Sequence, residues 1–233
     1  MRAWLQRSLL DVVPRDQRDT PRALRRRQVV TASFVVLGAV VLGFSLRLDA
    51  GSVWFYPATF GLAAIWTVGA FASGRLHLGR IARHDLYVRP ILTPIALGLA
   101  LAAIFVAGGL VVRQIEPLAR QVSTVLDFAD QGSLPILVVI TAVNGIAEEL
   151  FFRGAAYAAI PRNPVLWTTI AYVVATAATG NIMLSFAAVF IGVVVGLQRR
   201  ASGGILAPIL THCTWSLSML FFLPLVFGQT PGN

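Results

Sequence analysis

The stretch LPILVVITAVNGIAEELFFRGAAYAAI, residues 134–160, is long and apolar enough to cross a lipid bilayer as a helix. Two adjacent acids and an arginine, Glu148, Glu149 and Arg153, nevertheless lie inside it. A membrane helix tolerates such charges where they pair with one another or face a polar interior. This run therefore predicts a helix of a larger bundle and marks the position of a functional site within it.

Further apolar runs, each bounded by Gly, Pro or charged residues, accompany this one along the chain. They are Val29–Leu46, Val53–Ala72, Ile91–Val112, Val165–Thr179, Ile182–Leu197 and Ile205–Phe227. The chain is 57% hydrophobic and 12% charged, which excludes a soluble domain because a soluble fold needs far more polar surface. The sequence predicts an all-α polytopic membrane bundle of about seven transmembrane helices. Residues 1–28 would form an arginine-rich cytoplasmic arm, 29–227 the transmembrane domain and 228–233 a short tail.

The positive charges follow the pattern of membrane proteins, in which short basic segments stay in the cytoplasm. Besides the arm, the segments predicted to lie inside contain Arg75, Arg80, Arg83, Arg89, Arg162, Arg199 and Arg200. We expect an N-terminus inside and a C-terminus outside, in a plasma membrane of bacterial type. The net charge of +9 is explained by this topology, so the lipid bilayer is the expected partner and no nucleic acid is expected.

On a regular helix Glu149 and Arg153 are one turn apart and can pair. Glu148 points about 100° away and shares its face with Asn144 and Phe152. One carboxylate is thus neutralised and the other is left over. Because it is desolvated beside a like charge, Glu148 is the better candidate for a general base that activates water. The alternative is that both acids and the arginine form one packing network.

The histidine of the last apolar run, His212, is the second candidate. Pro208 lies one turn earlier, so we expect a kinked helix with a free carbonyl and a pocket on the face shared by Pro208, His212 and Ser216. Counting from the helix ends, Glu148 and His212 fall in the half of the membrane nearer the cytoplasm. They are predicted to line a common cavity open toward that side.

The ordered motifs resemble those of the CPBP family of intramembrane proteases, which includes the CAAX prenyl endopeptidases and bacteriocin-immunity (Abi-like) relatives. The matching elements are Glu148-Glu149-x-x-x-Arg153, Gly192-x-x-x-Gly196, Arg200-x-x-Gly203-Gly204 and Leu206-Ala-Pro-Ile-Leu-x-His212. The resemblance covers Leu134 to about Met219. It implies a glutamate-dependent peptidase acting on a membrane-associated, even prenylated, peptide, with Glu148 as base, Glu149 and Arg153 as its supporting pair, and His212 acting on the scissile carbonyl or the oxyanion.

Two elements depart from the family pattern. The segment 174–181 has neither the phenylalanine nor the histidine of the second motif, although Thr179 or Asn181 is able to hold a water. Ser216 replaces the final asparagine. Zinc would have at most three protein ligands, Glu148, Glu149 and His212, and would take up the general base. The alternatives to an enzyme are a non-catalytic membrane scaffold, chaperone or immunity factor that binds a partner through the same residues, and a small-molecule transporter, which the absence of internal repeats disfavours.

Overall fold

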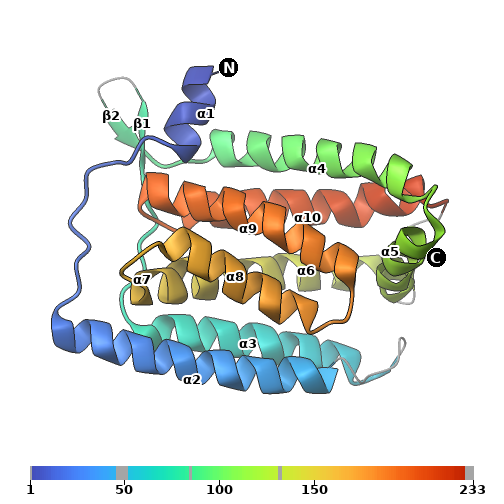
Figure 1. The fold of residues 1–233 in the computed structure, drawn as a ribbon, viewed down its shortest axis with the longest axis horizontal. Coiled ribbons are helices and arrows are strands. Elements are labelled where there is room, and N and C mark those ends of the chain that lie inside the picture. Colours follow the sequence, from blue (N-terminus) through green and yellow to red (C-terminus); the bar gives the residue numbers. More distant parts are fainter. Residues whose placement is uncertain (1, 46–51, 84–85, 131–132, 229–233) are drawn as a thin grey trace.

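The structure, a computed structural model, describes residues 2–45, 52–83, 86–130 and 133–228. Most of them are helical (Figure 1). The elements are α1 (Arg2–Leu9), α2 (Pro21–Ser45), α3 (Phe55–Ser73), β1 (Ile81–Arg83), β2 (Leu86–Val88), α4 (Leu92–Val112), α5 (Glu116–Asp130), α6 (Leu134–Glu148), the π-helix η1 (Glu149–Ala156), α7 (Tyr157–Ala159), α8 (Pro164–Ala177), α9 (Ile182–Ser202) and α10 (Leu206–Val226). This confirms the predicted all-α class.

The long helices lie side by side and form an elongated bundle (Figure 1). α10 packs against α4 and α6, α8 packs against α9, and α2 packs against α3, which in turn contacts α6 and η1. In the core, the Trp66 ring lies 4.6 Å from the Phe151 ring and 5.4 Å from the Phe152 ring, centroid to centroid. The segment that carries the two glutamates and the arginine is therefore held at the centre of the bundle.

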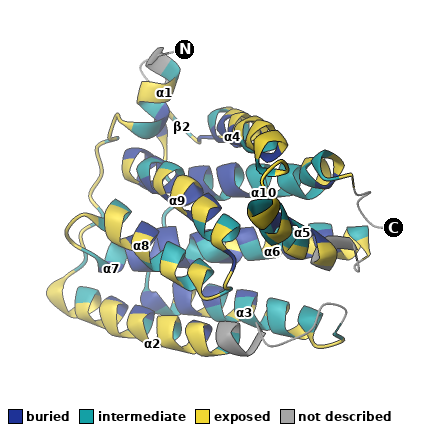
Figure 2. Ribbon diagram, turned by 45° about the vertical axis from the view of Figure 1, so that its right-hand side comes forward, coloured by how far each residue is buried: buried dark blue, intermediate teal, exposed yellow. Residues whose placement is uncertain are grey.

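Figure 2 shows that the exposed residues lie on the outward faces of the helices. Many of these residues have large apolar side chains. Val36 and Ile104 are each 65% exposed and Val174 is 64% exposed. Water would not tolerate so much contiguous apolar surface, whereas lipid does. Among the described residues, five helical segments are long and apolar enough to cross a membrane: α3, α4, the continuous α6–η1–α7 segment, α9 and α10. The chain is an integral membrane protein, but the count of seven spans is not confirmed, because α8 has only 14 residues and α2 is not among the five.

The arginine-rich segments meet at one end of the bundle, which we call the arginine end (residues 11–28, 74–83, 86–90, 160–163 and 199–205). There the Ile205 amide donates to the His77 carbonyl over 2.9 Å, and the Gln28 side chain donates to the Ala159 carbonyl over 3.1 Å. α10 finishes at the opposite end (Figure 1). Segments predicted to share one side of the membrane thus share one end of the molecule; which side this end faces stays a prediction.

Several boundaries differ from the predicted ones. The run 134–160 is not one regular helix, because α6 gives way to the π-helix η1 at Glu149. α9 continues to Ser202, so Arg199 is a buried helical residue rather than a loop charge. The hairpin β1–β2 and the amphipathic helix α5 were not predicted, and the predicted end of the first apolar run, Leu46, lies outside the described residues.

The expected kink at Pro208 has no basis in the structure. α10 begins at Leu206, so Pro208 lies in its first turn, where a backbone amide has no intrahelical partner to lose. The helix runs without interruption to Val226. The prediction of a free carbonyl on the His212 face assumed that Pro208 lies inside the helix, and this assumption was wrong.

Topology is tested by inserting a reporter into the exposed loop at Arg162 and by fusing another to the C-terminus. Because the loop belongs to the arginine end and α10 finishes at the opposite end, we expect the first reporter to be cytoplasmic and the second external. Alkaline phosphatase and green fluorescence measured in parallel give the readout. A cytoplasmic C-terminus would contradict the orientation and the odd number of crossings.

Candidate active site

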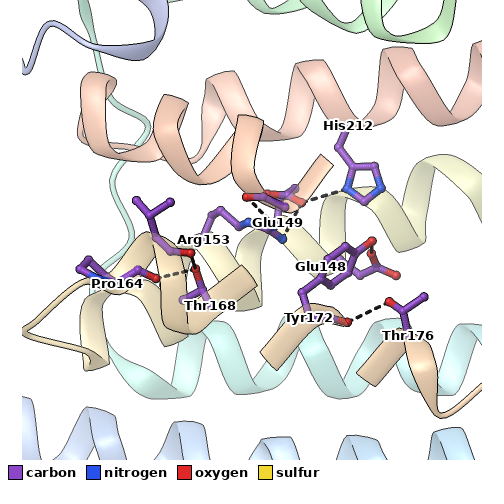
Figure 3. A network of polar contacts seen from close by, with 10 residues as sticks. Glu148, Glu149, Arg153, Pro164, Thr168, Tyr172, Thr176 and His212 are labelled. Atoms are coloured by element: carbon purple, nitrogen blue, oxygen red, sulfur yellow. Dashed lines mark hydrogen bonds and ion pairs between the residues drawn. The ribbon is translucent and has the colours of Figure 1, made fainter. Parts of the chain in front are cut away.

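Glu149 is the fixed centre of a buried polar cluster (Figure 3). It has no solvent-exposed surface, and its Oε1 accepts from Arg153 Nη1 over 3.1 Å. The same oxygen lies 2.9 Å from His212 Nδ1. An ionised carboxylate can only accept hydrogen bonds, so in this contact Nδ1 carries the proton. The other ring nitrogen, Nε2, can then form a hydrogen bond with another group. The predicted Glu149–Arg153 contact is confirmed, and His212 proves to be bound to this pair.

Arg153 connects three elements of the bundle. Its Nη2 donates to the Gly192 carbonyl of α9 over 3.4 Å, and its guanidinium lies 4.8 Å from the ring centroid of Tyr172 in α8. Gly192 allows this approach, since a Cβ there would come within 2.9 Å of Thr169 and 3.4 Å of Arg153. Gly192 and Gly196 thus let α9 pack closely against α8.

Glu148 is directed away from this cluster toward α8. Its Oε2 accepts a hydrogen bond from Tyr172 Oη over 2.7 Å (Figure 3). Unlike the fully buried Glu149, Glu148 is only partly buried. The prediction that the two acids point to different sides is confirmed, but Glu148, which was predicted to be left over, has a partner in the Tyr172 hydroxyl.

Tyr172 is the site residue that sequence reasoning missed. Its ring lies 5.2 Å from the Phe152 ring and 6.3 Å from the His212 ring. A signal was present, because a tyrosine hydroxyl in the middle of an apolar run needs a partner in lipid. The partner itself is on another helix and could not be identified from spacing along the chain.

The π-helix explains how both acids are used at once. In η1 the backbone is wound more widely than in an α-helix, and such segments are rare and concentrated at functional sites. The transition falls between Glu148, the last residue of α6, and Glu149, the first of η1. Glu148 therefore extends from the α-helical part and Glu149 from the π-helical part of the same segment. Glu148 reaches Tyr172, and Glu149 reaches His212.

The structure brings Glu148 and His212 near the same cluster, but each is bound to a different group (Figure 3). A cavity of about 540 Å³ lies next to this cluster, among α4, α5, α6, α9 and α10, and Trp215 and Ser216 line it. Neither Glu148 nor His212 is among the residues that line this cavity. The prediction of a common cavity open toward the cytoplasm is not tested by these contacts.

The remaining predicted residues have other partners. Asn144 donates to the Ile140 carbonyl of its own helix over 3.0 Å, and Ser216 donates to the Cys213 carbonyl over 3.4 Å. Thr179 and Asn181 are not brought into the cluster. Asn181 is the N-cap of α9, accepting from two backbone amides, and its side-chain amide donates to Gln121 of α5. The segment that replaces the second motif therefore serves the turn between α8 and α9.

The residues present do not fit a zinc site. Within the described part of the chain, no group of three or more His, Cys, Asp or Glu side chains is placed to hold a metal ion. Structural and catalytic zinc sites need at least three converging protein ligands.

Together the fold and the cluster define a polytopic helical membrane protein with a buried, charge-paired site built around two glutamates and a histidine. Residues 130–218 match the family of type II CAAX prenyl endopeptidases, described as Rce1-like. The match covers the segment that carries the motifs, and the predicted relationship to CPBP-type intramembrane proteases is thereby confirmed. Neither the curated proteins nor the solved structures give a match.

Proposed function

We propose that this protein is an intramembrane endopeptidase in which Glu148 activates the attacking water. The observation that supports this most is the contrast between the two acids: Glu149 is fully buried and bound to two cationic or polar side chains, whereas Glu148 is partly accessible and has one hydroxyl donor. A general base must reach its water and still be oriented. Glu148 meets both requirements, and Glu149 meets only the second.

In the proposed reaction the free oxygen of Glu148 takes a proton from water, and the resulting hydroxide attacks the scissile carbonyl. The carbonyl oxygen gains negative charge as the tetrahedral intermediate forms, and a positioned donor stabilises it. His212 would donate from Nε2, which requires a proton on each ring nitrogen, because Nδ1 is bound to Glu149. Glu148 then returns its proton to the leaving amine, which balances the reaction.

The surroundings of the cluster support a proposal for the substrate class. The 540 Å³ cavity next to the site is lined almost entirely by apolar side chains, with Trp215 and Ser216 near His212 in α10. A pocket of this size suits an apolar group rather than a polar peptide. This supports a membrane-associated peptide, including one that carries a prenyl chain, as the substrate.

A non-catalytic role has its own supporting observation. The segment 174–181 lacks the second-motif histidine, and its Asn181 caps a helix. In this alternative the same cluster holds a membrane partner without cleaving it, as in a scaffold, chaperone or immunity factor. The two functions differ in whether turnover occurs at all.

The deciding experiment uses purified protein in liposomes with a panel of membrane-embedded and prenylated peptides. We expect slow cleavage that persists in a chelator, because the histidine of the second motif is missing and the described residues contain no group of three or more side chains placed to hold a metal ion. Mass spectrometry of the products identifies the cleaved bond. No cleavage of any peptide would favour the binding protein, and activity lost on chelation and restored by zinc would contradict the metal-free mechanism.

Replacing Tyr172 with phenylalanine tests the orientation of Glu148. The ring would keep its packing on Phe152 and Arg153 but lose the hydrogen bond to the carboxylate. We expect kcat to fall about tenfold with KM unchanged, since a hydrogen bond to a charged group contributes about 1.5–3 kcal/mol. Thr176→Val is the matched control, because it removes a hydroxyl one turn along α8 that bonds only to the Tyr172 carbonyl. Equal rates for both variants would remove Tyr172 from the mechanism.

A further inference from the structure

The arginine end contains a second cavity, of about 500 Å³, that is separate from the glutamate cluster. Segments far apart in the sequence enclose it: residues 13–17 ahead of α2, residues 76–80 after α3, Arg89 after β2, and Ser202 at the end of α9. Its charged side chains are Arg15, Arg80 and Arg89. No acidic residue is among the described residues that line it.

The positive charge of this cavity is not neutralised within the described residues. The ion pairs among the described residues use Arg27, Arg120, Arg153 and His212 as the basic partner. None of these ion pairs involves Arg15, Arg80 or Arg89. His77 also lines the cavity. Burial is the main reason why the pKa of His77 is lowered below its ordinary value; the charges of Arg199, Arg27 and Arg75 lower it further, and that of Asp19 raises it. The cavity is therefore a site of positive potential that a bound anion would relieve.

The neighbouring carbonyl groups at the end of α9 would repel an anion if they were free, but each is already covered. The Ala201 carbonyl accepts from the Val13 amide over 3.0 Å and from Arg15 Nη1 over 3.4 Å. The Ser202 carbonyl accepts from the Arg80 amide over 2.9 Å. Arg15 has used one of its five N–H donors here, so the rest of its guanidinium is available to a ligand.

We propose that this cavity binds a phosphate group. Guanidinium groups match phosphate oxygens through paired hydrogen bonds, and three arginines from separate segments line this cavity. The volume exceeds that of a bare phosphate and leaves room for a substituent. Because the cavity lies at one end of a membrane bundle, the phosphate comes either from a lipid headgroup or from solution.

The test measures binding and needs no peptidase activity, so it is independent of the proposed function. The purified full chain in an uncharged detergent is titrated with short-chain phosphatidic acid, with inorganic phosphate, and with short-chain phosphatidylcholine. Melting temperature and native mass spectrometry report affinity and stoichiometry. We expect one tightly held phosphatidic acid or phosphate and little effect of phosphatidylcholine. A response to the lipid alone assigns the headgroup as the source, and an equal response to inorganic phosphate assigns a soluble anion.

The variant Arg15→Gln/Arg80→Gln/Arg89→Gln should weaken binding at least tenfold. Its matched control, Arg18→Gln/Arg22→Gln/Arg25→Gln, removes the same charge from positions of the same end that do not line the cavity, and should change affinity less than threefold. If the triple variant has a lower melting temperature than the wild type without ligand, the single variant Arg80→Gln is used instead. We expect it to lower the affinity for the phosphate probe about fivefold. Equal losses in the cavity and control variants, or no binding of either phosphate probe by the wild type, would overturn the site.

Discussion

Glu148→Gln is expected to abolish peptide cleavage, lowering the rate by about 10² to 10⁴. Glutamine is nearly isosteric and still accepts the hydrogen bond from Tyr172, so the bundle should stay intact. Glutamine cannot take a proton from water, and the adjacent Glu149 cannot replace Glu148 because it is fully buried and doubly bound. Initial rates on the best substrate of the peptide panel give the measurement.

Glu116→Gln is the control for this change. Glu116 lies in α5 at the opposite end from the arginine segments, is 81% exposed and pairs only with the exposed Arg120, so its replacement should leave the rate unaffected. Melting temperatures of the two variants show whether the fold is preserved. Equal cleavage by the wild type and Glu148→Gln would eliminate Glu148 as the base. If neither protein cleaves any peptide and both still support the protein's function in cells, the scaffold is favoured.

The parts of the structure that sequence predicted well are those governed by local rules. Apolar length alone located α3, α4 and α10 to within two residues at each end, because lipid imposes a minimum helix length. The Glu149–Arg153 pair was predictable because both residues lie on one segment, one turn apart. The arginine segments also gathered at one end, as their alternation along the chain had indicated.

The parts that sequence missed depend on contacts between distant segments. Tyr172 bonds Glu148 from another helix, and His212 bonds Glu149 although the leftover Glu148 had seemed its natural neighbour. Arg199 looked like a loop charge because it follows an apolar run, yet its Nε donates to the Arg153 carbonyl over 2.7 Å inside the bundle. Regular helical geometry also assumed 3.6 residues per turn where the chain forms a π-helix.

Glu149→Ala is expected to cause the largest loss of stability of any single change in the cluster. It would leave Arg153, which has no exposed surface, as an unpaired buried charge, and would remove the acceptor for His212 Nδ1. Breaking a buried ion pair by removing one partner costs about 3–5 kcal/mol, whereas replacing both partners with apolar groups is often neutral. The double variant Glu149→Ala/Arg153→Met should therefore recover part of the loss, although Gly192 and Tyr172 lose their contacts with the guanidinium.

The fraction of monodisperse protein extracted from membranes, and its melting temperature, should rank the wild type first, the double variant second and Glu149→Ala last. This order separates the ion pair from simple packing, because a packing role predicts that each added substitution lowers stability further. Activity gives an independent check: the double variant should fold but not cleave, since His212 has lost the carboxylate that holds its ring in place. A double variant no more stable than Glu149→Ala would show that Arg153 is held by its contacts to Gly192 and Tyr172 rather than by the carboxylate.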